Sequence, residues 1–415
     1  MTAKEACALL GIKPATLYAY ASRGLLSSLP GPPGGRARRY MQSELLRLKV
    51  QHDARSGHAP AAAGALAWGE PVLDSAITEI TPSGPRYRGR LAVDLANEDV
   101  TLERVAELLW TGTLPDEASA ASALRLSKPK MAAALEGGPS ALHRLPGFLV
   151  SLAAHDPARF AARVANAEAA RAGELARARD LLATLPLVLE PRGAHAASDP
   201  ARGAERVALG MARRLGLTRP RDAARAIDRA LVLAADHELN VSTFAARVVA
   251  SSGADTYACL IAAACAMTGT GHGGACDRVE ALVRETESAS HAARALEERA
   301  ARGEAIPGLG HTLYPAGDPR GAALLALARE LAPRSPRVRV SLAIADAGRN
   351  LFGLGGTLDI GLVAVADALG APPGTASALF ATGRTAGWIA HVLEQREQGR
   401  MVRPRARYVG APLSR

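Results

Sequence analysis

Residues 236–275 read DHELNVSTFAARVVASSGADTYACLIAAACAMTGTGHGGA. His237 and His272 stand near the two ends of this stretch among small or apolar neighbours, and the glycines around His272 would let a backbone or a ligand approach closely. The apolar run Ala258–Met267 is much shorter than the roughly 20 residues that cross a bilayer. The stretch therefore indicates polar groups set into the interior of a globular protein.

The composition indicates a globular chain with its positive charge concentrated at the N-terminus. The 415 residues allow about two or three domains, and 48% hydrophobic with 22% charged residues exclude a wholly disordered protein. Residues 1–55 carry more than half of the net charge of +10, which is typical of a segment that meets an anionic partner. The N-terminus lacks the pattern of a signal peptide, so we expect a cytoplasmic protein. The four cysteines form no CxxC pair or metal-ligand spacing, and we expect no metal site.

Residues 1–55 predict a small helix-turn-helix unit. Thr2 and Glu5 form a capping box for a first helix, Pro14 suits the first turn of a second helix, and Pro30–Gly35 makes a loop with arginines at its base. The string LGI…TLYAYASRGLL…GRARRY in this segment resembles the N-terminal DNA-binding half of the mercury-resistance regulator family.

In that family the second helix enters the major groove and the loop is a wing that lies on the phosphates. The resemblance implies that DNA is contacted by Lys13, Thr16, Tyr18, Arg23, Arg36, Arg38 and Arg39. The alternative is a helical appendage that no longer binds DNA, because no heptad run for a dimerising coiled coil follows this segment.

The rest of the chain predicts an all-α protein. Residues 56–70 predict a linker, and Ala76–Thr81 with Arg86–Arg88 predict one hairpin. Helices are predicted for stretches rich in Ala, Leu, Arg and Glu at 160–183, 202–215, 221–236, 278–302, 319–332, 339–351 and 384–398. The sequence contains no βαβ alternation, no GxGxxG and no phosphate-binding P-loop motif.

Five strings occur in the order that is usual in the citrate synthase family, and from about residue 70 to the C-terminus the chain resembles that family. They are YRGRLAVDLA…VAELLWTGTLP (87–115), the stretch 236–275, PGLGHTLYPAGDPRG (307–321), TLDIGLVAVADALG (357–370) and ATGRTAGWIAHVLEQ…RPRARYVG (381–410). The resemblance implies a large helical domain over 71–276 and 376–415 and a smaller helical domain over 277–375.

The resemblance also implies a reaction, the condensation of acetyl-CoA with oxaloacetate and hydrolysis of the thioester to citrate and CoA. Asp359 would remove a proton from the methyl group of acetyl-CoA, and His272 would hydrogen-bond the thioester oxygen of the developing enol. His311 would polarise the ketone of oxaloacetate. Acetyl-CoA is the substrate in this reaction, and no cofactor or metal is implied.

Further residues would hold oxaloacetate. His237 would contact it, and Arg320, Arg384 and Arg403 match the carboxylate clamps of the family, where planar and permanently charged forks suit a dicarboxylate. The last of these arginines reaches in from the other subunit in the family, so Arg403 implies a homodimer.

The chain departs from the family pattern near the candidate base. Thr357 and Leu358 stand where Asn-Val commonly precede the aspartate, Cys276 ends a segment that usually reads GPLHGGAN, and Pro315 replaces a common basic residue. These departures leave the acyl donor open, so a 2-methylcitrate synthase that uses propionyl-CoA is an alternative. A protein of another class, a DNA-binding regulator that uses the synthase body as a metabolite sensor, is a second alternative.

Overall fold

A computed structural model gives the structure of the chain. It describes residues 2–10, 12–22, 26, 28–30, 38–40, 45, 73–117, 140–156, 167–189, 206–404 and 410. The chain divides into two compact units, which we call the N-terminal unit (Met1–Asp74 with Arg403–Arg415) and the large unit (Ser75–Val402). The expected boundaries between a larger and a smaller domain within the large unit stay predictions.

The N-terminal unit begins with two short helices, α1 (Ala3–Leu10) and α2 (Pro14–Ser22). The capping box is confirmed, because the backbone N–H of Thr2 donates to Glu5 Oε2 at 2.8 Å and that of Glu5 donates to Thr2 Oγ1 at 3.3 Å. Proline occupies the first position of α2, where no N–H is needed.

A two-stranded antiparallel hairpin follows the two helices. It pairs β1 (Ser28–Pro30) with β2 (Arg38–Tyr40), and the predicted loop Pro30–Gly35 lies, beyond Pro30, outside the described residues. Leu17 of α2 and Tyr40 of β2 are both buried in a small apolar core. The described part of this unit is thus a helix-turn-helix with a wing.

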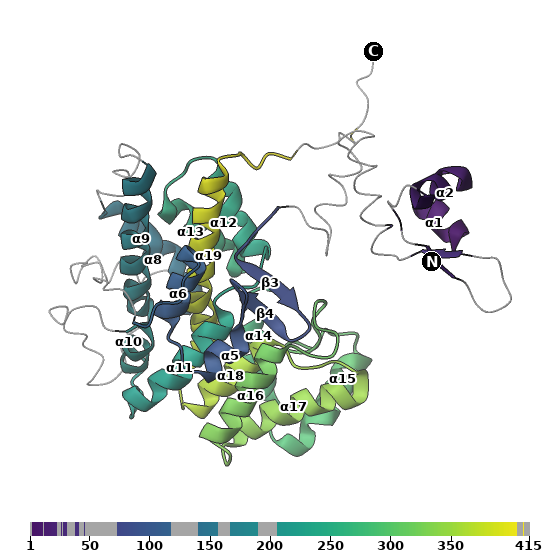
Figure 1. The fold of residues 1–415 in the computed structure, drawn as a ribbon. Helices are drawn as coiled ribbons and strands as arrows, with labels where there is room; N and C mark the ends of the chain where they lie inside the picture. The colour runs from purple at the N-terminus through teal and green to yellow at the C-terminus, as the bar shows by residue number, and fades with distance from the viewer. Residues whose placement is uncertain are drawn as a thin grey trace. The chain divides into compact units, whose positions relative to one another are not determined.

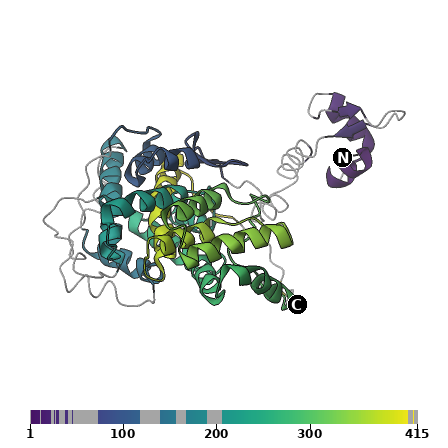
Figure 2. The ribbon, with the colours of Figure 1, turned by 90° about the horizontal axis from the view of Figure 1, so that it is seen from below.

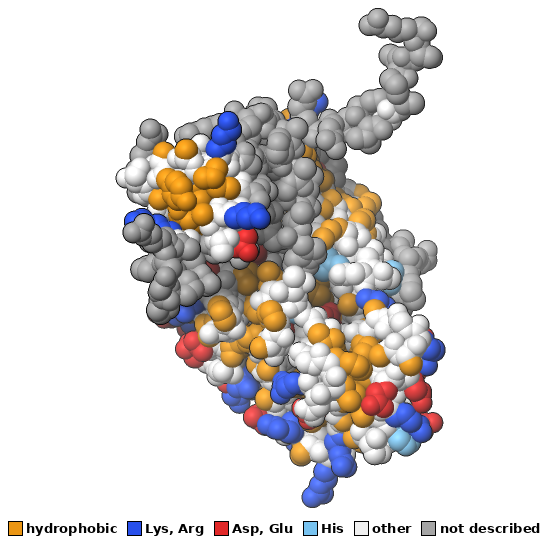
Figure 3. All heavy atoms as spheres, turned by 90° about the vertical axis from the view of Figure 1, so that its right-hand side faces the viewer, with side chains coloured by type: hydrophobic (Ala, Val, Ile, Leu, Met, Phe, Trp, Pro, Cys, Tyr) orange, Lys and Arg blue, Asp and Glu red, His pale blue; other side chains and the backbone are white. Residues whose placement is uncertain are grey.

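The large unit is built from helices, and the prediction of an all-α fold is confirmed. They are α5 (Ala92–Asn97), α6 (Leu102–Thr111), α8 (Ala141–Ala154), α9 (Ala167–Thr184), α10 (Val207–Arg214), α11 (Pro220–Ala234), α12 (Val241–Ser251), α13 (Thr256–Met267), α14 (Ala275–Glu285), α15 (Ala292–Ala301), α16 (Pro319–Leu331), α17 (Pro336–Phe352), α18 (Leu358–Ala368) and α19 (Thr375–Gln398), with 3₁₀ turns at Leu185–Val188 and Ala289–His291. Within the described ranges, none of the helices is long and apolar enough to cross a membrane. On the face that Figure 3 draws, basic and acidic side chains are interspersed among apolar ones.

Three short antiparallel strands precede the helices of the large unit. They are β3 (Thr78–Thr81), β4 (Gly84–Tyr87) and β5 (Arg90–Leu91), in the order β3-β4-β5. The first two form the predicted hairpin, and the third strand was not predicted. Figure 1 shows the strands beside the helices of this unit.

Helix α19 is the central helix of the large unit. It packs against α6, α8, α11, α12, α13 and α18, and Figures 1 and 2 both show it in yellow among the other helices. Small residues permit this, because a Cβ on Gly383 would lie 2.5 Å from the carbonyl oxygen of Leu231, and one on Gly387 would lie 2.4 Å from that of Ala235. Polar side chains on α19 are therefore buried among its neighbours.

The predicted helical stretch 278–302 is interrupted. Helix α14 ends at Glu285 and α15 begins at Ala292, with a 3₁₀ turn between them. Thr286 and Ser288 both have extended backbone conformations. Hydroxyl residues are poor formers of helix interiors, and this short break is hidden when composition is averaged over a long window.

Helices α16 and α18 pack very closely through glycines. A Cβ added to Gly321 of α16 would lie 2.3 Å from the carbonyl oxygen of Thr357, and a Cβ added to Gly361 of α18 would lie 2.8 Å from Leu324 Cβ. Both distances are shorter than a real contact, so only glycine allows this approach.

Gly321→Ala is expected to lower the free energy of unfolding by about 1–3 kcal/mol, because its Cβ would overlap a backbone carbonyl that cannot rotate away. Gly147→Ala in α8 is the matched control: nothing lies within 4 Å of its Cβ, and alanine is favoured over glycine in a helix interior by about 0.5–1 kcal/mol. Denaturant unfolding of both variants measures the difference. Equal stability of the two variants would contradict the close packing of α16 on α18.

Candidate active site

The candidate residues lie at the ends of helices or in the loops between them. His237 follows α11, and His272 precedes α14. His311 precedes α16, whose first turn holds Arg320. Asp359 lies in the first turn of α18. Arg384 alone lies in mid-helix, where it is buried in α19.

Backbone hydrogen bonds join the loop that carries His311 to the segment before α18. The N–H of Gly310 donates to the carbonyl of Gly355 at 2.8 Å, and the N–H of Thr357 donates to that of Gly308 at 2.9 Å. His311 and Asp359 are thus carried by two segments that are tied to each other, although 48 positions separate them in the sequence.

His237 and His311 meet around a tyrosine. The centroids of the two imidazole rings are 5.3 Å apart in an edge-to-face arrangement. Tyr314 contacts both rings, and its hydroxyl is 3.1 Å from His237 Nε2. The guanidinium of Arg320 lies 5.8 Å from the centroid of the same tyrosine ring. The structure therefore brings together these three predicted residues around Tyr314, a residue that the prediction did not include.

The tautomer of His311 follows from its backbone contact. The N–H of Leu313 donates to His311 Nδ1 at 3.1 Å, so a neutral ring must carry its hydrogen on Nε2. Burial, followed by the charge of Arg320, lowers the pKa of His311. The ring is thus a neutral donor through Nε2 at pH 7.

His272 is tied to Ser242 of α12. The distance between His272 Nε2 and Ser242 Oγ is 2.7 Å, and Trp388 Nε1 donates to the same oxygen at 3.0 Å. Ser242 has one hydroxyl hydrogen and two acceptors within reach, His272 Nε2 and Asn240 Oδ1, each at 2.7 Å. When the hydroxyl donates to the imidazole, the neutral ring carries its hydrogen on Nδ1.

The protonation of His272 follows from burial and from a nearby arginine. Burial, and after it the charge of Arg384, lowers the pKa of His272 to about 4. The Arg384 guanidinium lies 4.8 Å from the centroid of the Phe380 ring, whose own centroid is 5.9 Å from that of His272. The imidazole is thus neutral at pH 7.

Arg320 is a buried cation, and one of its guanidinium nitrogens has no hydrogen-bond partner among the described residues. Its Nε and one terminal nitrogen donate to the two carboxylate oxygens of Asp318 at 3.0 and 2.7 Å. Burial opposes the charge on Arg320, but Asp318 outweighs it and the net pKa is raised. The other terminal nitrogen, NH1, is buried and has no hydrogen-bond partner in the described part of the chain. A buried donor of this kind is costly unless an acceptor meets it.

The charge of Asp236, the residue directly before His237, acts on Arg384. Arg384 Nε donates to the carbonyl of Ala234 at 2.8 Å, and burial lowers the pKa of this arginine to about 10, so it remains charged at pH 7. Asp236 is fully buried. Burial would raise its pKa, but His391 and Arg384 outweigh burial and the net shift is downward.

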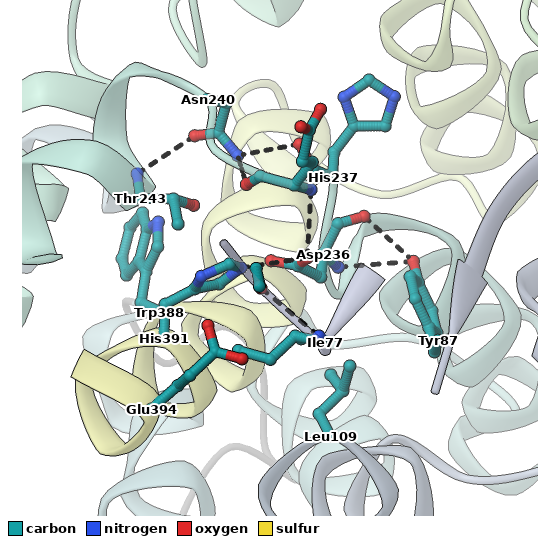
Figure 4. Close-up of polar contacts among 12 residues, drawn as sticks. Ile77, Tyr87, Leu109, Asp236, His237, Asn240, Thr243, Trp388, His391 and Glu394 are labelled. Atoms are coloured by element: carbon teal, nitrogen blue, oxygen red, sulfur yellow. Dashed lines mark hydrogen bonds and ion pairs between the residues drawn. The ribbon is translucent and has the colours of Figure 1, made fainter. Parts of the chain in front are cut away.

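A network of hydrogen bonds holds the loop that carries His237. The Tyr87 hydroxyl donates to the carbonyl of Asp236 at 3.2 Å, Glu238 N–H donates to Asp236 Oδ2 at 3.1 Å, and His391 Nε2 is 3.4 Å from the same oxygen. Figure 4 shows these contacts, and it shows the His237 ring pointing away from them. The network therefore orients the loop and leaves the ring free for other contacts.

Asp359 receives two hydrogen bonds. The Cys276 thiol donates to Oδ1 at 3.3 Å and the Thr357 hydroxyl donates to Oδ2 at 2.9 Å. The charge of Asp359 acts on both His311 and Arg384, which places the carboxylate in the same cluster.

Arg403 lies outside the unit that holds this cluster. Arg403 is exposed and belongs to the segment Arg403–Arg415, outside the large unit. The other six candidates lie in the large unit. Among the described residues, no group of three or more His, Cys, Asp or Glu side chains is placed to hold a metal ion.

The candidate DNA-contacting residues are described only in part. Lys13, Tyr18 and Arg38 are exposed, and Thr16 is half-buried. Arg23 and Arg36 lie outside the described residues, and so does the side chain of Arg39.

Fold and site together define an all-α protein whose buried cluster of imidazoles, guanidinium groups and one carboxylate suits an anionic substrate. Citrate synthase, C-terminal domain, is the family that matches residues 65–405, and a helix-turn-helix domain matches residues 1–51. The chain belongs to the citrate synthase family.

Curated relatives carry the names of two related activities. The chain is 36% identical over 188 residues to citrate synthase 2 of Bacillus subtilis strain 168, and 35% identical over 190 residues to 2-methylcitrate synthase of Shewanella oneidensis. These matches cover 45% and 44% of this chain and half of each relative, so the chain spans about half the length of the curated relatives it matches.

A solved structure shares the fold over most of the chain. It is a ternary complex of the citrate synthase from Thermoplasma acidophilum with carboxymethyl coenzyme A and oxaloacetate. The TM-score is 0.72 at 23% identity, and the match covers 85% of this chain and 97% of that one.

The depressed pKa of His272 gives a pH dependence with a definite sign. Because this pKa is about 4 in the folded protein and 6.5 ordinarily, the unfolded chain binds more protons between these two values. The contribution of His272 to the free energy of unfolding is therefore complete above about pH 6.5 and is lost as the pH falls toward 4. Histidine NMR, with His272→Gln to identify the signal, measures the titration; a midpoint near 6.5 would contradict the burial described here.

Proposed function

We propose that this protein condenses a short acyl-CoA with oxaloacetate and hydrolyses the resulting thioester, which gives citrate and CoA when the acyl group is acetyl. The observation that carries the proposal is the convergence of three neutral imidazoles, two buried guanidinium groups and one carboxylate in a member of the citrate synthase family. The resemblance to the citrate synthase family implies roles in one reaction for these six residues, and their proximity supports those roles.

Oxaloacetate fits the cationic part of the cluster. The unpaired NH1 of Arg320 offers a donor to one carboxylate, and Arg384 supplies a second positive charge. His311 Nε2–H would then donate to the ketone oxygen, and His237 would contact the same substrate. A neutral donor suits this step because burial, and after it the positive charge of Arg320, disfavours an imidazolium at His237 and His311.

The acyl-CoA would react at the other side of the cluster. Asp359 takes a proton from the carbon next to the thioester, while His272 Nδ1–H donates to the thioester oxygen as negative charge develops there. This requires the hydroxyl of Ser242 to donate to His272 Nε2, so Ser242 would set the tautomer. The enol carbon then bonds to the ketone carbon, and the ketone oxygen takes a proton through His311 Nε2–H, which balances the proton that Asp359 removed. Water then cleaves the thioester, giving its hydroxyl to the acyl carbon and its hydrogen to the sulfur of CoA.

Arg403 has a place in this scheme only as part of a dimer. We propose that it completes the dicarboxylate site of the partner in a homodimer. Its exposure within its own chain is compatible with such a role.

The acyl donor is a finer question within the same proposal. Relatives named as citrate synthase and as 2-methylcitrate synthase both match this chain. One methylene changes discrimination in an apolar pocket by only about 1–3 kcal/mol, so parallel assays with acetyl-CoA and propionyl-CoA distinguish the two.

Asp359→Asn is expected to lower kcat for CoA release by about 10²–10⁴-fold, because it removes the base without changing the shape of the side chain. Asp346→Asn on α17, an exposed aspartate, is the matched control and should keep full activity. A thiol assay with oxaloacetate and each acyl-CoA measures the rates. The proposal is wrong if the unchanged protein releases no more thiol than Asp359→Asn.

DNA binding is a second candidate function, carried by the helix-turn-helix match over residues 1–51. Lys13, Tyr18 and Arg38 are exposed, as contacts to DNA require. A protein that only regulates transcription is not favoured, because the cluster of six candidate residues would then serve no reaction.

The double variant Lys13→Ala, Arg38→Ala should weaken retention on DNA at low salt. Each lost phosphate contact is expected to reduce the slope of log K against log salt by about 1. Arg294→Ala on α15, which also removes an exposed positive charge, is the control. Identical retention of the unchanged protein and the double variant would rule out this DNA-binding surface.

A further inference from the structure

Two departures from the family pattern meet at one carboxylate. Cys276 stands where the family string ends in asparagine, and Thr357 stands where the family commonly has asparagine two residues before the base. The two side chains are 81 positions apart in the sequence, yet each donates a hydrogen bond to a different oxygen of Asp359.

Thr357 is positioned so that its hydroxyl donates a hydrogen bond to Asp359. It is the N-cap residue of α18, where a threonine side chain usually accepts a bond from the first turn, but here it makes no cap bond. Its hydroxyl donates to Asp359 Oδ2 at 2.9 Å, and its own N–H is fixed by the carbonyl of Gly308. The usual stabilisation of the helix start is thus replaced by a bond to the carboxylate.

Cys276 donates a hydrogen bond to the other oxygen of the same carboxylate. It lies in the first turn of α14, directly after the loop that carries His272, and its side chain is fully buried. Burial and the charge of Asp359 raise the pKa of the Cys276 thiol well above its ordinary value. The thiol therefore keeps its hydrogen at neutral pH and faces the carboxylate as a donor.

We propose that Cys276 and Thr357 are positioning residues that hold the Asp359 carboxylate through one S–H and one O–H hydrogen bond, and that these bonds set its orientation. The kinetic part of this inference rests on the proposed function. The two donors reach different oxygens of the carboxylate, so together they fix the direction in which it faces.

Infrared spectroscopy tests the S–H bond without any assay of activity. The difference spectrum between the unchanged protein and Cys276→Ser isolates the S–H stretching band of Cys276. In an Asp359→Asn background the same band should move to higher frequency, because a neutral amide is a weaker acceptor than a carboxylate. A band that keeps its frequency when Asp359 is replaced would overturn the inference.

Kinetics test the positioning role. Cys276→Ala and Thr357→Val are each expected to lower kcat by about 10- to 100-fold with little change in KM for oxaloacetate, since each removes a bond to a charged group that does not touch this substrate.

Cys259→Ala is the matched control, because Cys259 is also fully buried but lies in α13. It should reproduce the loss of stability of Cys276→Ala and leave kcat unchanged. If Cys276→Ala and Cys259→Ala behave alike in kcat, the positioning role is wrong. If the unchanged protein releases no thiol from any acyl-CoA, the proposed function fails, and the infrared shift still decides whether the S–H bond exists.

Discussion

Two buried positive charges, on Arg320 and Arg384, govern the chemistry of the groups around them. Burial of a charge is costly unless other charges compensate it. Asp318 accepts two hydrogen bonds from the Arg320 side chain, and the negative charge of Asp236 partly compensates that of Arg384. Burial, and after it the positive charge of these arginines, keeps the neighbouring imidazoles neutral, and the same charge favours a dianion in this space. The protein thus leaves part of its own charge for a ligand to compensate.

Helix α19 supplies the support for this arrangement. Arg384, Trp388 and His391 are spaced four and three residues apart, so they project from one face of the helix. The first bonds the end of α11, the second bonds Ser242, and the third meets Asp236. One buried helix therefore fixes the loop that carries His237 and, through Ser242, the ring of His272, which explains why so many of its polar residues have no access to solvent.

Much of the fold follows from local sequence, and much of the site does not. Turn residues and helix formers predict the hairpin and the helices α11 and α16, whereas the break at 286–291 is too short for composition to reveal. The charged and imidazole groups stand out because their neighbours are small or apolar. The residues that contact these groups do not stand out, because the contacts join distant positions of the chain. Ser242 is 30 positions from His272 and 146 positions from Trp388. Such contacts depend on tertiary packing, and only the presence of these residues in the matching strings hinted at them.

The glycine contact between α16 and α18 has a mechanical consequence. Because Gly321 and Gly361 let the two helices touch along their backbones, and because the loops before them are hydrogen-bonded to each other, we expect these segments to move together. Arg320 travels with one helix and Asp359 with the other. Any opening or closing of the unit would carry the two side chains together, so the separation between them would stay constant while their distances to His237 changed.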